Sequence, residues 1–114
     1  MDELKRFSNI NIKYHASFDK LIIKCGSLAE QLEDLKKVIK ILIYKIQSKE
    51  IKKGTVIIEV SGKDFLSDEI MVLLNIMKFT KTSHYFNIVV KNGSDNRIEF
   101  IKDKYKGVNI NEGI

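Results

Sequence analysis

The arrangement of apolar and polar residues along the chain predicts alternating strands and helices. Apolar side chains alternate with polar ones from Asn9 to Tyr14, and a second short apolar run extends from Lys20 to Cys25. Such patterns are typical of strands with one buried face. Because His15 to Asp19 form a short connection, we expect the two strands to pair as an antiparallel hairpin.

The clearest predicted helix begins after Gly26 and extends to about Lys49. Ser27 and Glu30 have the spacing of a capping box, in which each side chain binds the backbone amide of the other residue. Apolar residues then recur at steps of three and four, which places them on one face of a helix. They are Leu28, Leu32, Leu35, Ile39, Leu42 and Ile46, with Val38, Ile41, Ile43 and Tyr44 widening the stripe.

The middle of the chain predicts a buried strand, a polar turn and an apolar helix. The strand, Thr55 to Val60, is rich in β-branched residues. The helix, from Ile70 to near Lys81, has apolar residues on nearly every side. Some of them cannot face the sheet, so this surface is expected to meet a partner or another copy of the chain. These residues are Met71, Val72, Ile76 and Phe79.

The end of the chain allows two interpretations. Tyr85 to Val90 predicts another buried strand. Asn92–Gly93 has the form of a hairpin turn, which would pair this strand with Arg97 to Phe100. Alternatively, residues 94–106 form a helix, and we favour the helix. The alternation from Val108 to Ile110 predicts a short last strand.

The predicted order is β-β-α-β-α-β-α-β, which indicates an α/β fold with a single mixed β-sheet and helices packed against it. The 114 residues suffice for one core, so residues 1–114 are expected to form one domain. No apolar run reaches the roughly 18 residues of a membrane span, and the start lacks a signal-peptide pattern. The single cysteine, Cys25, fits a reducing compartment. We therefore expect a cytoplasmic protein that has no membrane partner.

The positive charge of the chain lies in its first half. Residues 1–53 contain 12 Lys and Arg against 7 Asp and Glu, whereas residues 54–114 contain 8 of each, which gives the net charge of +5. One alternative is therefore a nucleic-acid-binding accessory protein that uses lysines of the long helix. These are Lys36, Lys37, Lys40 and Lys45. The scarcity of arginine, which is favoured for bidentate phosphate contacts, disfavours this alternative.

The residues that carry metal or covalent chemistry are sparse. His15, Cys25 and His84 lack the spacing of metal ligands. Cys25 has no base beside it that would lower its pKa. No glycine-rich phosphate-binding motif follows a predicted strand. We therefore expect no enzyme, no cofactor and no metal.

Hydroxyl and carboxylate groups crowd against predicted core elements at one place, the turn Lys63 to Glu69. A structural interpretation makes Ser67 the N-cap of the following helix, with Asp68 and Glu69 favourable beside the helix dipole. A functional interpretation makes the same turn a partner-binding or regulatory site. That site comprises Asp64, Ser67, Asp68, Glu69 and Met71.

The stretch VIIEVSGKDFLSDEIMVLL resembles the core motif of STAS domains, the fold of the anti-anti-sigma factors and sulfate-transporter tails. In that family a buried strand leads into an apolar-Asp-Ser-Ser-Gly turn and then a helix. Gly26–Ser27 and Asn96–Gly107 fit the start of the family's first helix and its final helix. The resemblance implies a small regulatory protein that is controlled by phosphorylation and binds a kinase-like or phosphatase regulator through Asp64–Met71. A homodimer would instead use the apolar surface of the following helix.

The chain departs from the family at the modified position. Ser67-Asp68-Glu69-Ile70 stands where the family has Asp-Ser-Ser-Gly, so Asp68 matches the phosphorylated serine. Either Asp68 is a permanent mimic of phosphate, or phosphorylation has moved to Ser67, or this relative has no switch. A phosphate on Ser67 would add a charge of about −1.5 to −2 beside Asp68 and Glu69 and release the partner. The helix N-terminus would partly offset that repulsion.

Overall fold

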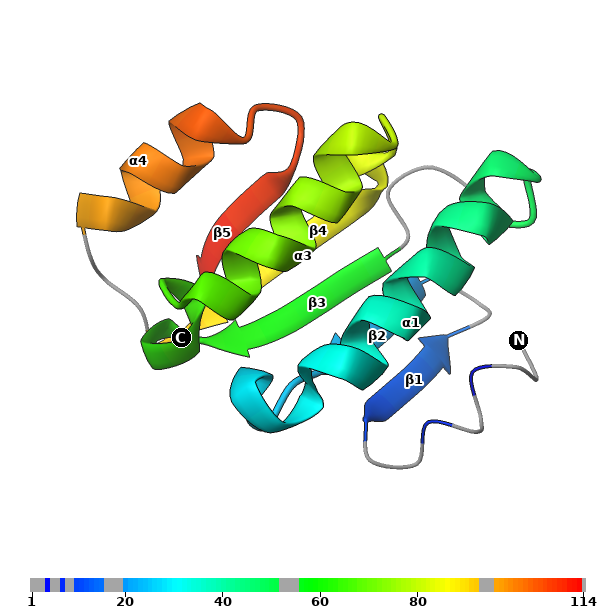
Figure 1. The fold of residues 1–114 in the computed structure, drawn as a ribbon, viewed down its shortest axis with the longest axis horizontal. Helices are drawn as coiled ribbons and strands as arrows, with labels where there is room; N and C mark the ends of the chain where they lie inside the picture. The colour runs from blue at the N-terminus through cyan, green and yellow to red at the C-terminus, as the bar shows by residue number, and fades with distance from the viewer. Residues whose placement is uncertain are drawn as a thin grey trace.

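The computed structural model describes residues 4, 7, 10–15, 20–51, 56–92 and 96–113. Strands and helices follow the predicted order, β-β-α-β-α-β-α-β, with two additional short helices, α2 and η3 (Figure 1). The elements are β1 (Asn11–His15), β2 (Lys20–Lys24), α1 (Leu28–Gln47), β3 (Val56–Ser61), α2 (Gly62–Phe65), α3 (Asp68–Phe79), η3 (Ser83–Tyr85), β4 (Phe86–Lys91), α4 (Asn96–Lys104) and β5 (Asn109–Gly113).

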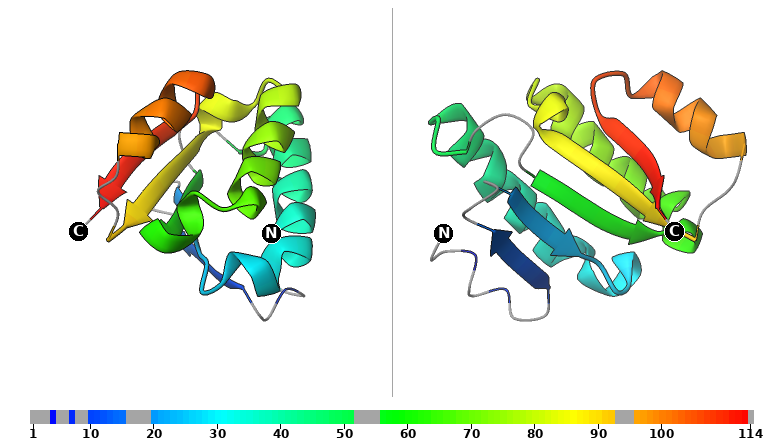
Figure 2. Two further views of the ribbon diagram at one scale, coloured as in Figure 1. Left: turned by 60° about the vertical axis from the view of Figure 1, so that its left-hand side comes forward. Right: turned by 180° about the vertical axis from the view of Figure 1, so that it is seen from behind.

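The five strands form one mixed sheet in the order β1-β2-β3-β4-β5. β1 pairs antiparallel with β2, which confirms the predicted hairpin, and the other three pairings are parallel. Right-handed crossovers that advance in one direction across a sheet place their helices on the same face. α1 and α3 accordingly lie side by side over one face (Figure 1), and no described helix covers the opposite face, seen from behind in Figure 2.

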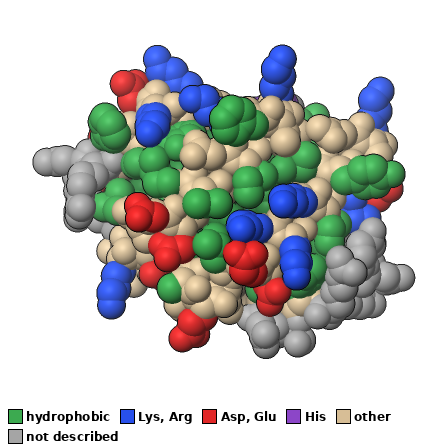
Figure 3. Space-filling view, viewed as in Figure 1, with side chains coloured by type: hydrophobic (Ala, Val, Ile, Leu, Met, Phe, Trp, Pro, Cys, Tyr) green, Lys and Arg blue, Asp and Glu red, His purple; other side chains and the backbone are tan. Residues whose placement is uncertain are grey.

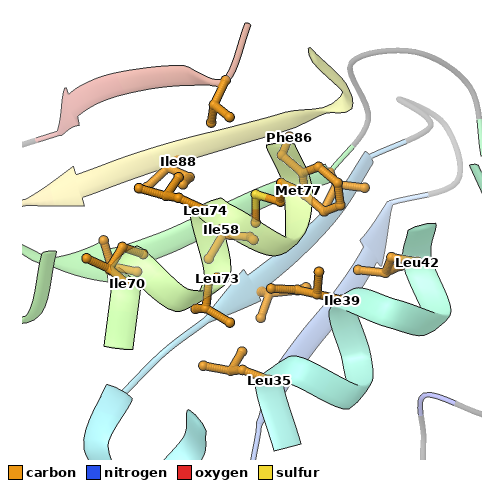
Figure 4. Packing of buried hydrophobic residues seen from close by; sticks show 14 of the residues in the cluster. Leu35, Ile39, Leu42, Ile58, Ile70, Leu73, Leu74, Met77, Phe86 and Ile88 are labelled. Atoms are coloured by element: carbon orange, nitrogen blue, oxygen red, sulfur yellow. The ribbon is translucent and has the colours of Figure 1, made fainter. Parts of the chain in front are cut away.

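The core lies between the sheet and the two helices α1 and α3. Side chains of β3 and β4 alternate between buried and half-buried, and Ile58 and Ile88, which are partners in the register, are fully buried. Burying such a side chain contributes about 1.5–3 kcal/mol. Figure 4 shows how helix and strand side chains converge on this layer. The labelled residues are Leu35, Ile39, Leu42, Ile58, Ile70, Leu73, Leu74, Met77, Phe86 and Ile88.

The contacts near both ends of the long helix α1 differ from those predicted. It begins at Leu28 as expected, but Ser27 makes no side-chain cap bond, so the predicted capping box is wrong. The Gly26 amide instead donates to Gln31 Oε1 at 3.1 Å. Near the other end, Tyr44 is 68% exposed although it was expected to widen the buried stripe. Lys45 takes a buried position there, and its Nζ bonds Glu50 Oε2 at 3.1 Å.

The final segment is a helix, α4, rather than the second strand of a hairpin. Ile98, Ile101 and Tyr105 are buried, which is the apolar face that favoured the helix. The Tyr105 hydroxyl donates to Asn75 Oδ1 at 2.9 Å and so joins the end of α4 to α3. Gly107 then turns the chain with a φ of +103°, a backbone conformation that glycine adopts without strain.

Several boundaries move by one to three residues. β3 ends at Ser61 and β4 at Lys91, each one residue later than predicted, and β5 extends to Gly113. α3 ends at Phe79 rather than near Lys81. The first residues of two predicted strands, Asn9 and Thr55, lie outside the described residues. Among the helices that are described, none is long and apolar enough to cross a bilayer.

Candidate functional site

The predicted turn lies at the carboxyl end of the central strand β3. β3 has parallel neighbours on both sides, β2 and β4, so three strand ends meet at this edge of the sheet. In open α/β sheets, binding sites form outside the carboxyl ends of the parallel strands. The position of the turn is therefore one where such folds place function.

Ser61 and Asp64 hold the first half of the turn through two hydrogen bonds. The backbone amide of Asp64 donates to Ser61 Oγ at 3.1 Å, which makes Ser61 the N-cap of α2. The Ser61 hydroxyl in turn donates to Asp64 Oδ2 at 2.9 Å. The sequence prediction missed Ser61, although a serine followed three residues later by an acidic residue is a capping signal.

Ser67 takes the N-cap position of α3, as predicted, but its side chain does not cap the helix. Its hydroxyl donates to the carbonyl oxygen of Asp64, and its backbone amide donates to the same oxygen at 3.0 Å. The predicted N-cap position is therefore confirmed, but the Ser67 hydroxyl bonds the preceding turn instead of a helix amide. Asp64 bonds Ser61 and Ser67 through its amide, its carboxylate and its carbonyl, so it is the centre of the turn.

The other three predicted site residues follow on the first turn of α3. Asp68 is exposed, whereas Glu69 and Met71 are half-buried. Both carboxylates lie in the first turn of the helix, where the dipole stabilises negative charge. Figure 3 shows acidic side chains gathered over this end of the helical layer. The turn therefore presents a negatively charged surface beside one half-buried methionine.

Cys25 approaches this turn from the end of β2. Its backbone amide donates to the carbonyl of Glu59 at 3.1 Å, which continues the pairing of β2 with β3. Burial, and to a smaller extent the negative charge of Asp64, raises the pKa of the Cys25 thiol from 9.0 to about 12. The thiol is therefore protonated at neutral pH and is a poor nucleophile. The sequence pattern did not place Asp64 near this cysteine, because the two residues lie on different elements.

The residues considered for metal binding do not converge. Among the described residues, no group of three or more His, Cys, Asp or Glu side chains is placed to hold a metal ion. His84 is exposed and its ring lies 4.4 Å from the ring of Tyr85, measured between centroids. His15 lies at the end of β1, an edge strand that β2 and β3 separate from β4, whereas His84 lies in η3 just before β4.

One of the four lysines considered for nucleic-acid binding is not available at the surface. Lys45 is buried and bonds Glu50, and the Lys36 ammonium bonds Glu33 Oε1 at 3.0 Å. Lys37 and Lys40 are exposed. Because phosphate binding requires ammonium groups that reach the solvent, the buried Lys45 weakens this alternative.

Comparisons with known proteins leave the family open: a scan of protein-family models, a search of curated proteins and a search of solved structures each found no match. The fold described above is that of a small α/β protein with a five-stranded mixed sheet. Function must therefore be argued from the geometry of the turn and from the chemistry of its residues.

Proposed function

We propose that this protein is a small, non-catalytic regulatory domain with a STAS-like fold that binds a partner protein. The binding surface comprises Asp64, Ser67, Asp68, Glu69 and Met71. The observation that carries the proposal is the arrangement around Asp64, where two serine hydroxyls bind one residue beside an exposed carboxylate. The partner class that the resemblance suggests is a kinase-like or phosphatase regulator.

Three features support the STAS-like assignment. The element order agrees with the one on which the resemblance rests, and α1 begins directly after Gly26–Ser27. A helix, α4, follows β4, where the resemblance requires a final helix. The turn and α3 follow the buried strand β3, as the motif requires. The short helix α2 between β3 and the turn adds a structural element that the motif alone did not predict.

Phosphorylation of Ser67 would change this surface in two ways. The hydroxyl proton would be replaced, so Ser67 could no longer donate to the Asp64 carbonyl. The phosphate would also add about −1.5 to −2 charges beside Asp68 and Glu69. The α3 dipole offsets part of that repulsion, typically 0.3–1 kcal/mol at exposed sites. We expect the combined effect to open the turn and release the partner.

The exposed Asp68 gives the unmodified surface a fixed negative charge. A partner that binds it should therefore present basic or amide groups, together with an apolar site for the half-buried Met71. We therefore expect the partner to bind the unmodified protein and to dissociate from the phosphorylated one.

The proposal is tested by affinity capture from the native cell with four versions of the protein. Wild type is compared with Ser67→Ala, Asp68→Ser and the control Ser27→Ala. Ser27 is a suitable control because it also takes a helix N-cap position without a side-chain cap bond. We expect Asp68→Ser to lose or exchange a partner that wild type and Ser27→Ala retain. Intact-mass measurement of the native protein reports phosphorylation directly.

Two results would contradict the proposal in separate parts. An identical set of captured proteins for wild type, Ser67→Ala and Asp68→Ser would remove the binding role of the turn. Absence of a phosphorylated species under several growth conditions would remove the switch and leave the binding role in place.

A further inference from the structure

α3 carries a second apolar stripe on the side that faces away from the sheet. Val72, Ile76 and Phe79 are spaced by four and three residues, so they lie along one side of the helix. Val72 is 38% exposed and Phe79 is 84% exposed, whereas Ile76 is half-buried. The opposite side of α3 buries Ile70, Leu73, Leu74 and Met77 in the core. Ile76 still packs against the edge of the core, whereas Val72 and Phe79 leave much of their apolar surface to solvent.

Tyr44 is a further exposed aromatic residue, on the neighbouring helix. α1 and α3 contact each other and run side by side over the sheet (Figures 1 and 2). Tyr44 lies near the carboxyl end of α1 and is 68% exposed, and Phe79 is the last residue of α3. We refer to Tyr44, Val72, Ile76 and Phe79 together as the outer helical face.

The segments that carry this face are rich in lysine, although Glu50 follows the first segment and Asp68 and Glu69 precede the second. Residues 35–49 hold five lysines and no Asp or Glu, and residues 70–92 hold three lysines and no Asp or Glu. Lys37, Lys40, Lys78 and Lys81 are exposed. In Figure 3 most acidic side chains lie toward the lower left of the helical layer and most basic ones toward its middle and upper right, with some of each kind among the other. The outer helical face is therefore an apolar stripe beside exposed positive charge.

We propose that the outer helical face docks an acidic amphipathic helix of a partner protein. An apolar stripe at helical spacing is the pattern that an amphipathic helix covers when it lies along another helix. Acidic side chains flanking the partner's apolar face would complement the lysines. A second copy of this chain would bring lysines against lysines, so self-association through this face is disfavoured. The proposal is independent of the turn, because it uses different residues and the opposite charge.

The test uses a synthetic amphipathic peptide with leucines on one helical face and glutamates on the other. Two control peptides have the same composition in an order that breaks the stripe, or lysines in place of the glutamates. Binding is followed by chemical-shift perturbation and titration with wild type, Phe79→Ser and Phe100→Ser. Phe100 is the matched control because it is also a largely exposed phenylalanine, 67% exposed, on the separate helix α4.

We expect saturable binding of the acidic amphipathic peptide, with perturbed resonances on α1 and α3. Phe79→Ser should weaken binding about tenfold or more, as truncation of an aromatic anchor does, whereas Phe100→Ser should bind like wild type. Equal binding of the scrambled peptide, or unchanged binding by Phe79→Ser, would overturn the proposal. So would self-association that Phe79→Ser abolishes, or binding to anionic vesicles without binding to the peptide. The turn variant Ser67→Ala, which changes no charge, should leave peptide binding unchanged, which separates this test from that of the proposed function.

Discussion

Ser61→Ala should destabilise the protein more than Ser67→Ala, although the sequence pattern favours Ser67 as the helix cap. The Ser61 hydroxyl makes two bonds, since it accepts from the Asp64 amide at 3.1 Å and donates to Asp64 Oδ2 at 2.9 Å. The Ser67 hydroxyl makes one bond, to the Asp64 carbonyl, which also accepts from the Ser67 amide. The first substitution therefore leaves a helix amide without its acceptor, and the second leaves the carbonyl bonded.

The magnitudes follow from these bonds. Replacing an N-cap serine by alanine costs about 0.5–2 kcal/mol, typically about 1. The second bond, to the carboxylate of the half-buried Asp64, adds to this, so we expect roughly 1–2 kcal/mol for Ser61→Ala. For Ser67→Ala we expect about 0.5 kcal/mol, because one neutral bond is lost. In a domain of this size, 1 kcal/mol corresponds to a decrease in Tm of about 4 °C.

Urea unfolding monitored by circular dichroism measures both variants, and unchanged slopes would show that the free energies of unfolding can be compared. Ser27→Ala is the reference, because the Ser27 side chain makes no cap bond and its loss should cost less than about 0.5 kcal/mol. A double-mutant cycle of Ser61→Ala with Asp64→Ala should show coupling. The reasoning is refuted if Ser67→Ala costs as much as Ser61→Ala, or if the coupling is absent.

The further predictions concern two residues elsewhere in the fold, Cys25 and Tyr105. Alkylation of Cys25 in the native protein should be much slower than in urea at pH 8, because burial raises its pKa from 9.0 to about 12, and Asp64→Asn should accelerate it. The same shift makes the Cys25 contribution to stability complete below about pH 9 and progressively lost as pH rises toward 12, measurable by urea unfolding across that range. Tyr105→Phe should cost about 0.5–1 kcal/mol, since it removes the bond to Asn75, whose exposed carbonyl can turn to water. Tyr105→Ala should cost about 3–5 kcal/mol, because it also leaves a cavity; similar losses for both variants would show that the ring is not packed.

The sheet and the two main helices could be predicted because their patterns are periodic. β3 alternates buried and half-buried residues through Ile58, and α1 places Leu35, Ile39 and Leu42 on one face. These patterns report burial directly, so they predicted the elements and their order. The mixed sheet followed because the short loop before β2 forces an antiparallel pair, while helical crossovers produce parallel ones.

The errors occur where a local pattern competes with a tertiary contact. Ser27 and Ser67 both have capping sequences, but neither side chain caps its helix. In the turn, Asp64 offers a carbonyl that the Ser67 hydroxyl bonds instead. Tyr44 and Lys45 are adjacent on α1, and the lysine is the buried one because Glu50 follows the helix and pairs with its ammonium. A one-dimensional pattern contains no information about such a partner.

The proximity of the candidate site residues could be predicted from the sequence, whereas their function stays a prediction. The residues Asp64, Ser67, Asp68, Glu69 and Met71 do lie together after β3, because a strand end and a helix start are joined by a short turn. Ser61 and Cys25 could be added only from the structure. Cys25 comes from a different strand, and the pairing of β2 with β3 is what brings it near Asp64.

The helix dipoles explain the charge distribution along α1 and α3, but they do not explain the exposed aromatic residues. Acidic residues at helix starts and lysines at helix ends each stabilise the dipole by about 0.3–1 kcal/mol, so this asymmetry alone requires no partner. The exposed side chain of Phe79 has no such explanation, because 84% exposure buries little apolar surface. Phe79→Ser should therefore leave the free energy of unfolding within about 0.5 kcal/mol of wild type. If Phe79→Ser instead destabilises the protein by more than about 1 kcal/mol, the ring contributes to folding, and its exposure no longer indicates a docking surface.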